Sequence, residues 1–135
     1  MKIKLDPWGT MPTLAHPDDA GWDLYAPEDV CIMPGEVVTI KTGVHVQLPR
    51  ATAGIIKNRS SMFRRGIITD GTIDRGFVGE IGVTLINVGA YDYHIAKGDR
   101  IAQLVIVGIM RSSWELVDEL DPSARGAGGF GSSGK

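Results

Sequence analysis

The sequence predicts an all-β domain, either a jelly roll or a barrel-like sandwich. Short runs rich in valine, isoleucine and threonine follow one another along the chain, and the 135 residues contain 18 glycines and 7 prolines. Glycine and proline at that frequency interrupt helices and argue against a helical bundle. They fall between the apolar runs, as turn residues fall between short strands. Many short strands with long irregular connections are typical of jelly rolls and distorted barrels, and composition does not choose between the two.

Nine runs are predicted to be strands, and turn residues separate nearly all of them. In chain order they span residues 2–5, 37–40, 44–48, 54–57, 66–69, 80–87, 91–95, 101–107 and 114–117. One short helix is predicted at residues 60–65, where strand-favouring residues lapse and two arginines follow Met62 and Phe63.

The chain is predicted to form one domain, residues 1–120, followed by a tail, residues 121–135. A chain of this length with 43% hydrophobic residues buries one core and is too short for two ordinary domains. From Asp121 onward the sequence is mostly glycine, serine and alanine, with Phe130 as the only large apolar side chain. A segment with so little to bury is expected to be flexible.

Glycines in the tail match two phosphate-binding patterns, and both matches are weak. Residues 126–131 satisfy G-x-G-x-x-G, and residues 129–135 satisfy most of G-x-x-x-x-G-K. Each pattern binds phosphate only where a strand precedes the loop and a helix follows it, and the tail supplies neither. A backbone rich in N–H groups, with Arg125 and two serines, is still suited to fold over a polyphosphate. A plain disordered tail is the alternative.

Charge and composition indicate which class of substrate the protein binds and in which compartment it is located. The net charge is −2 and the pI is about 5.9, so no basic field is available for a nucleic-acid polymer, whereas a small anion bound at a local site is compatible. The single cysteine, Cys31, forms no internal disulfide, and no signal segment opens the sequence. Since no apolar run approaches the roughly 20 residues of a membrane helix, we expect a soluble cytoplasmic protein without membrane contact.

Five short segments carry a family resemblance. They are residues 20–24 (AGWDL), 59–61 (RSS), 71–80 (GTIDRGFVGE), 98–104 (GDRIAQL) and 125–134 (RGAGGFGSSG). In order and approximate spacing they resemble the five motifs of the trimeric dUTPase family, in a compact form similar to phage and retroviral members. The resemblance implies a jelly-roll-like distorted barrel with a C-terminal lid. It also implies a Mg²⁺-assisted hydrolysis of dUTP to dUMP and diphosphate, which limits dUTP and supplies dUMP for thymidylate synthesis, in a homotrimer with shared active sites.

Asp74 is the predicted catalytic residue. Hydrolysis of a phosphoanhydride needs a water aimed at phosphorus, and a carboxylate both holds that water and accepts its proton. From the residues alone, an aspartate in a hairpin turn between Gly71 and Gly76 is the plainer interpretation. The resemblance assigns Asp74 to the attacking water and to the deoxyribose 3′-hydroxyl.

The resemblance also assigns recognition of the nucleoside. Phe77 stands where the family usually has tyrosine, and a flat ring there excludes a ribose 2′-hydroxyl by sterics, although an ordinary core aromatic is the alternative. The segment between residues 59 and 74 lacks the asparagine that many cellular dUTPases use. Uracil contacts are therefore assigned to the main chain of the hairpin at about residues 68–73, which includes Gly71, Thr72 and Ile73, and of Gly82 on the opposite strand.

The remaining assignments concern phosphate and metal. Arg59, Ser60 and Ser61 offer a guanidinium and two hydroxyls suited to phosphate oxygens and a leaving diphosphate, although a solvated turn is the alternative. Asp23 is the candidate partner of Mg²⁺ through water, because that ion keeps several waters and few carboxylates. By resemblance, Gln103 contacts the phosphates. The tail residues assigned to substrate are Arg125, which reaches the γ-phosphate, Phe130, which covers the uracil, Gly131 and Ser132.

Three other functions are the competing interpretations, and the first is well separated by its residues. A dCTP deaminase is similar in fold and has an arginine that Arg64 matches, but it needs a glutamate as proton shuttle where this chain has Thr84. A nucleotide-binding regulator with a protein partner is not excluded by the motifs. A capsid-like jelly roll without an active site is disfavoured by the complete motif set.

Overall fold

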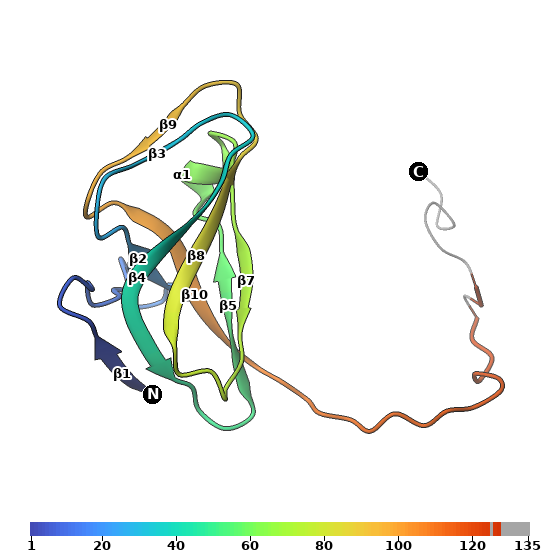
Figure 1. The fold of residues 1–135 in the computed structure, drawn as a ribbon. Helices are drawn as coiled ribbons and strands as arrows, with labels where there is room; N and C mark the ends of the chain where they lie inside the picture. The colour runs from blue at the N-terminus through green and yellow to red at the C-terminus, as the bar shows by residue number, and fades with distance from the viewer. Residues whose placement is uncertain (125, 128–135) are drawn as a thin grey trace.

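Ten strands and one short helix form along the chain, and the computed structural model describes residues 1–124 and 126–127 (Figure 1). The elements are β1 (Lys2–Leu5), β2 (Gly21–Tyr25), β3 (Val30–Ile32), β4 (Val37–Gln47), β5 (Thr52–Lys57), α1 (Ser60–Phe63), β6 (Ile67–Ile68), β7 (Asp70–Ile73), β8 (Glu80–Asn87), β9 (Tyr93–Ile95) and β10 (Arg100–Gly108).

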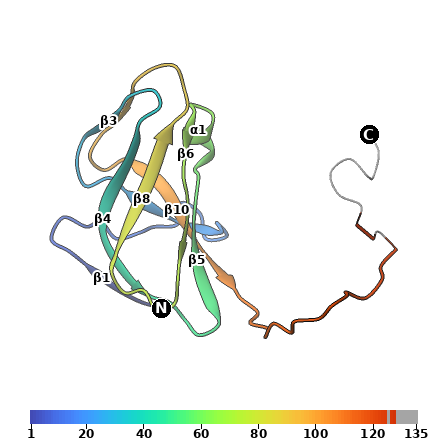
Figure 2. The same cartoon turned by 45° about the vertical axis from the view of Figure 1, so that its right-hand side comes forward.

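Two four-stranded antiparallel sheets enclose the core and confirm the predicted all-β distorted barrel. Their strand orders are β1-β4-β8-β6, of which Figure 2 shows β1, β4 and β8 in succession, and β2-β10-β5-β7. Strands β3 and β9 pair separately as a two-stranded ribbon (Figure 1). Strand β8 shows how sequence sets the layers, because Ile81, Val83 and Leu85 alternate with exposed residues and are completely buried. A period of two places alternate side chains on one face, and that face is the core.

The structure corrects several predicted element boundaries. The predicted strands at residues 37–40 and 44–48 are one strand, β4, which ends at Gln47 and whose pairing with β8 is irregular between Lys41 and His45. Gly43 lies in this irregular stretch with φ of +68°, and a Cβ there would come within 2.6 Å of the Gly9 backbone, so glycine is required. The nine predicted strands do not include β2, β3 or β7, although β7 falls within the hairpin predicted at about residues 68–73. The helix ends at Phe63 rather than at residue 65.

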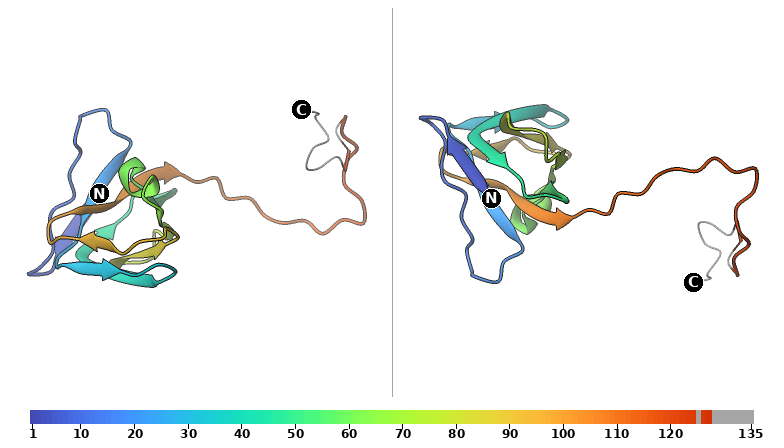
Figure 3. Two further views of the ribbon diagram at one scale, coloured as in Figure 1. Left: turned by 90° about the horizontal axis from the view of Figure 1, so that it is seen from above. Right: turned by 90° about the horizontal axis from the view of Figure 1, so that it is seen from below.

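The predicted strand at residues 114–117 is wrong. These residues form no strand, and Trp114 and Leu116 are almost fully exposed at 99% and 101%. The segment after β10 runs away from both sheets (Figure 3), so its main chain finds no neighbouring strand in the described part of the chain. A strand needs a partner for its backbone hydrogen bonds, and local propensity does not supply one.

Asn87 is a completely buried polar residue that joins three segments of the fold. Its side-chain Nδ2 donates to the carbonyl oxygens of Ile32 and Tyr91, both at 2.8 Å, and its Oδ1 accepts from the Gly89 amide at 2.9 Å. The side chain thereby fixes β3 and the loop before β9 to the end of β8.

Replacing Asn87 by leucine should destabilise the protein by about 3 kcal/mol, because one buried and two part-buried hydrogen bonds to the backbone would be lost. Urea denaturation followed by circular dichroism measures the change. Thr84→Val is the matched control on the same strand, since Thr84 is exposed and hydrogen-bonds Thr39. Its effect should stay within about 0.5 kcal/mol.

No helix among the residues that the structure describes is long and apolar enough to cross a membrane.

Candidate active site

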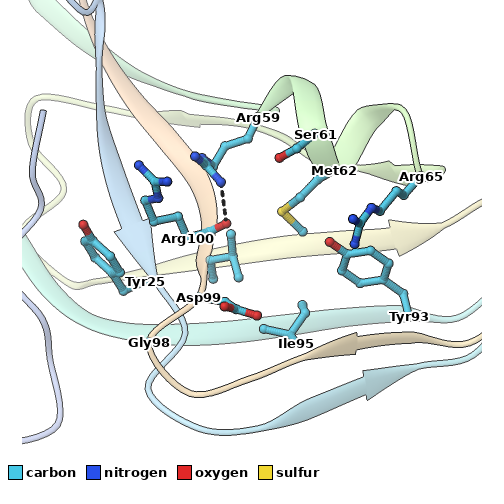
Figure 4. A pocket seen from close by; sticks show the side chains of 11 residues that line it. Tyr25, Arg59, Ser61, Met62, Arg65, Tyr93, Ile95, Gly98, Asp99 and Arg100 are labelled. Carbon is cyan, nitrogen blue, oxygen red and sulfur yellow. Dashed lines mark hydrogen bonds between the residues drawn. The ribbon is translucent and has the colours of Figure 1, made fainter. Parts of the chain in front are cut away.

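A buried carboxylate holding two arginines forms the centre of the first cluster. Asp23, on β2, is 7% exposed. Its Oδ1 accepts from Arg59 Nε at 3.0 Å, and its Oδ2 accepts from Arg100 Nη1 at 3.1 Å. Arg59 also donates through Nη1 to the carbonyl oxygen of Arg100 at 3.3 Å (Figure 4). One carboxylate between two guanidiniums leaves a net charge of +1, with the remaining N–H donors available to an anion.

Two hydroxyls and an amide lie beside these arginines. Ser60 and Ser61 open α1, directly after Arg59, and both are exposed. Gln103 pairs with Asp23 across the β2–β10 ladder and donates through Nε2 to the Asn58 carbonyl at 2.9 Å. Gly21 leaves the room for this amide, because a Cβ there would lie 2.6 Å from Gln103 Oε1.

Together these side chains line one polar cavity. The cavity is formed by Ala15, Asp19, Ala20, Gly21, Asp23, Arg59, Ser60, Ser61, Arg100 and Gln103. An adjoining cavity shares Arg59, Ser61 and Arg100 and adds Arg65 and Tyr93 among its lining residues (Figure 4). Arg100 and Arg65 were missed in the sequence analysis. Arg100 lies inside the segment 98–104 and directly precedes Ile101, a predicted core residue of the strand. That position was the only sign in the sequence that Arg100 belongs to the site.

The second cluster lies at the far end of β7. Gly71, Thr72 and Ile73 pair with β5, and β7 is the edge strand of its sheet. An edge strand leaves one row of backbone donors and acceptors free for a ligand with complementary groups. Asp74 follows β7 directly, and its side chain is exposed.

A tight turn brings Phe77 next to Asp74. The Phe77 amide donates to the Asp74 carbonyl oxygen at 2.9 Å. The Phe77 ring is 44% exposed and lies over Gly79, where a Cβ would come within 2.6 Å of the ring. Phe77 is therefore not the core aromatic of the alternative interpretation, and its ring is accessible to a ligand.

Gly82 lies on β8, the strand that follows Asp74 in the sequence. It pairs with Lys41 on β4, and no pairing joins β8 to β7. Strand β8 instead pairs with β6, whose Ile68 begins the predicted hairpin. The chain passes from one sheet to the other between β6 and β7, and the ladder partner of Ile68 is Ile86, four residues beyond Gly82.

Comparison with known proteins identifies the family. The family model described as dUTPase matches residues 8–134. This chain belongs to the dUTPase family. It is 48% identical to the deoxyuridine 5'-triphosphate nucleotidohydrolase of Thermobifida fusca, over 97% of this chain and 76% of that protein. With the corresponding enzyme of Clostridium tetani the identity is 44%, over 100% of this chain and 97% of that protein.

Solved structures of phage dUTPases share the fold of this dUTPase-family chain. A mutant of the Staphylococcus bacteriophage 80alpha dUTPase with dUpNHpp superposes with a TM-score of 0.93 at 32% identity, covering 99% of this chain and 98% of that chain. A mutant dUTPase from phage phi11 of S. aureus, described with a structural Mg(II) ion, gives a TM-score of 0.81 at 28% identity, covering 87% of this chain and 96% of that chain.

The two clusters do not meet within one chain of this dUTPase family member. One row of paired residues crosses the sheet from β2 to β7 through β10 and β5. In that order the row is Asp23, Gln103, Lys57 and Asp70. Asp74 is four residues beyond Asp70, which is roughly 13 Å along the strand, while β2 and β7 are about 14 Å apart across three strand spacings. Together these two offsets separate Asp74 from Asp23 by roughly 20 Å, which is farther than two neighbouring side chains can reach.

Four of the predicted site residues, Arg125, Phe130, Gly131 and Ser132, lie outside the described residues.

His45 connects the loop after Asp74 to the N-terminal segment. Its Nδ1 lies 3.2 Å from the Val78 carbonyl oxygen, and its Nε2 lies 3.0 Å from Asp6 Oδ2. Only the protonated ring donates to both acceptors at once. The Asp6 carboxylate, and then the Val78 carbonyl, raise the pKa of His45 above its ordinary value of 6.5, against the smaller opposing effects of burial and Lys4.

We expect His45→Gln to destabilise the protein most at low pH. A raised pKa means that the folded state binds the proton more tightly than the unfolded state. The stabilisation is therefore complete below pH 6.5 and is lost as the pH rises through the folded-state pKa. Urea denaturation of both proteins from pH 5.5 to 9, roughly the range over which a raised histidine pKa titrates, measures the difference. His16→Gln, on an exposed histidine, should show no such trend.

Proposed function

We propose that this chain hydrolyses dUTP to dUMP and diphosphate, with Asp74 as the catalytic residue. One observation carries the proposal: buried Asp23 orients Arg59 and Arg100 beside the exposed residues Ser60 and Ser61. A net cationic pocket of this kind suits a polyphosphate. Its relatives from T. fusca and C. tetani are both named deoxyuridine 5'-triphosphate nucleotidohydrolase.

In the proposed reaction a water attacks the α-phosphorus. The water oxygen forms a bond to that phosphorus as the bond to the oxygen bridging to the β-phosphorus breaks. Asp74 orients the water and takes its proton, and the departing diphosphate carries away the electron pair of the broken bond. Asp74 is exposed in the single chain, so it is accessible to both substrate and water. Arg59 and the two serines stabilise the negative charge that grows on the leaving group.

Nucleoside selection is assigned to the edge of β7. The backbone of Gly71, Thr72 and Ile73 offers the alternating donors and acceptors that match the amide-like edge of uracil. The exposed Phe77 ring packs against the deoxyribose and leaves no room for a 2′-hydroxyl. Gly82 lies on β8 opposite Lys41, and its assignment to uracil rests on the family resemblance alone.

Mg²⁺ fits this pocket as an ion held through its water ligands. Both oxygens of Asp23 already accept hydrogen bonds from guanidiniums, so direct coordination would break ion pairs, whereas a contact through water keeps them. Mg²⁺ retains several waters and binds mainly to substrate phosphates, which agrees with this donor set. When bound, it neutralises charge on the triphosphate.

The site is proposed to be shared within a homotrimer. The clusters around Asp23 and Asp74 lie too far apart in one chain to hold one nucleotide. The segment after β10 also runs away from the domain, and its apolar side chains are exposed to solvent. Among them are Met110, Trp114, Leu116 and Leu120. A second copy of the chain would cover these side chains and bring residues 121–135 to a neighbouring site as a lid.

Release of diphosphate from dUTP, dCTP, dTTP and UTP, with and without Mg²⁺, tests the proposed function. Rapid release from dUTP alone, dependent on Mg²⁺, is expected. Conversion of dCTP to dUTP with release of ammonia would instead support the deaminase alternative. The Thr84 hydroxyl lies 2.8 Å from the Thr39 hydroxyl and has no group suited to shuttle a proton, so no ammonia is expected.

The division into residues 1–120 and 121–135, the cytoplasmic location and a regulatory protein partner remain predictions. One neighbour, the Staphylococcus bacteriophage 80alpha dUTPase, is described as controlling transfer of virulence genes.

A further inference from the structure

Three metal-ligating side chains gather on the β3–β9 ribbon, and none of them lines either of the two cavities described above. The thiol of Cys31, the carboxylate of Asp92 and the imidazole of His94 each offer one ligand atom, and these atoms all lie within 4.8 Å of one another. The ladder explains their arrangement. Cys31 and His94 are direct cross-strand partners, and Asp92 precedes His94 by two residues, so that it shares the same face of the ribbon.

The opposite face of the ribbon is anchored in the core. Ile32 and Ile95 alternate with the cluster residues and are 0% and 3% exposed. The buried amide of Asn87 donates to the carbonyls of Ile32 and Tyr91, which directly follow Cys31 and directly precede Asp92. The backbone positions of two ligands are thus set by one buried side chain. A preorganised backbone reduces the ordering cost of binding an ion.

We infer that Cys31, Asp92 and His94 form a site for a borderline-soft divalent cation such as Zn²⁺. Thiolate, imidazole and carboxylate together are a ligand set typical of zinc, and three protein ligands leave a position for water. Tetrahedral bond lengths place the ligand atoms roughly 3.4 to 3.6 Å apart. Because all three side chains are exposed, rotation about their side-chain torsions closes the 4.8 Å arrangement to that spacing.

The charges around the cluster favour a cation that binds a thiolate. Cys31 as thiolate and Asp92 supply two negative charges, which match one divalent ion. Arg65 lines the same cavity as Asp92 and His94, and its positive charge opposes any bound cation, so a strong thiolate–metal bond is needed to offset it. Mg²⁺ prefers oxygen ligands and is therefore not the expected occupant. The proposal is independent of dUTP hydrolysis, because no residue of the Asp23 or Asp74 cluster contributes to it.

Titration of the nucleotide-free full chain with Co²⁺ tests the site. We expect one Co²⁺ ion per chain and a near-ultraviolet charge-transfer band from the thiolate. Adding Zn²⁺ should displace the Co²⁺ and remove the band. Cys31→Ser should abolish the band. His94→Gln and Asp92→Asn should each weaken the affinity for Co²⁺ and Zn²⁺ by about tenfold or more, the scale on which even partners of metal ligands act. His16→Gln is the control and should change nothing. His16 is an exposed histidine that precedes Asp18 and Asp19 by two and three residues.

Two results would overturn the inference. Absence of the band in the wild-type chain would show that the cluster binds no such ion. A band that persists unchanged in His94→Gln and Asp92→Asn would show binding by the Cys31 thiol alone. Thermal unfolding in EDTA, which should be the same for all variants because the replaced side chains are exposed, separates loss of binding from loss of fold.

Discussion

Asp74→Asn is expected to lower kcat for dUTP by roughly 10² to 10⁴, the range that a positioned general base contributes. Asparagine keeps the size and polarity of the side chain but accepts no proton from the attacking water. Contacts of the triphosphate with Arg59 and the serines remain, so dUTP binding should change little. The loss would then lie in the transition state rather than in substrate binding.

Pre-steady-state turnover and equilibrium binding of a non-hydrolysable dUTP analogue measure the two effects separately. Asp70→Asn is the matched control, because Asp70 lies four residues earlier, at the start of β7, and is exposed. Its carboxylate accepts from Lys57 Nζ at 2.6 Å and has no assigned part in the reaction. Near-normal kcat in Asp74→Asn, or an equal loss in Asp70→Asn, would contradict the assignment of Asp74.

Sequence periodicity predicted the parts of the fold that depend on local pattern. Strand β8 agrees with its prediction at both ends, because Ile81, Val83 and Leu85 alternate with exposed residues without interruption. Strand β2 was missed because it contains Asp23, a charged residue that is rarely buried alone. Asp23 is buried through Arg59 and Arg100, which stand 36 and 77 residues away in the sequence. No local pattern records such a long-range pairing.

The candidate site was predicted where a motif names the residue and missed where tertiary contacts assign it. Asp23, Arg59, Ser60, Ser61 and Gln103 were selected from motifs, and the structure brings them to one cavity. Arg100 follows a charged turn and resembles a solvated arginine until its ion pair with Asp23 is seen. The pairing of Gly82 with Lys41 on β4 likewise could not be predicted from its position after Asp74, since adjacency in sequence does not determine which strand pairs with which.

A mixture of two inactive variants is expected to regain activity. One variant is Asp74→Asn, and the other ends at Ala124 and lacks the tail with Arg125. The tail variant alone should lose most of its kcat, because closure of a lid over the nucleotide excludes bulk water and brings Arg125 to the leaving diphosphate. The fold and assembly of this variant should be unchanged, since Arg125 lies 17 residues beyond Gly108, where β10 ends.

Recovery follows if Asp74 and the tail of one site come from different chains. Random trimers formed from an equal mixture then carry both intact parts in about one quarter of their sites. The separation of the Asp23 and Asp74 clusters within one chain, and the exposed apolar residues Trp114 and Leu116 on the departing segment, both favour this arrangement. Co-refolding the two variants and assaying diphosphate release measures the recovery, and each variant refolded alone is the control. If Asp74 and the tail of a site belonged to the same chain, no mixture would regain activity, and a monomer in sedimentation that stays active at high dilution would exclude a shared site altogether.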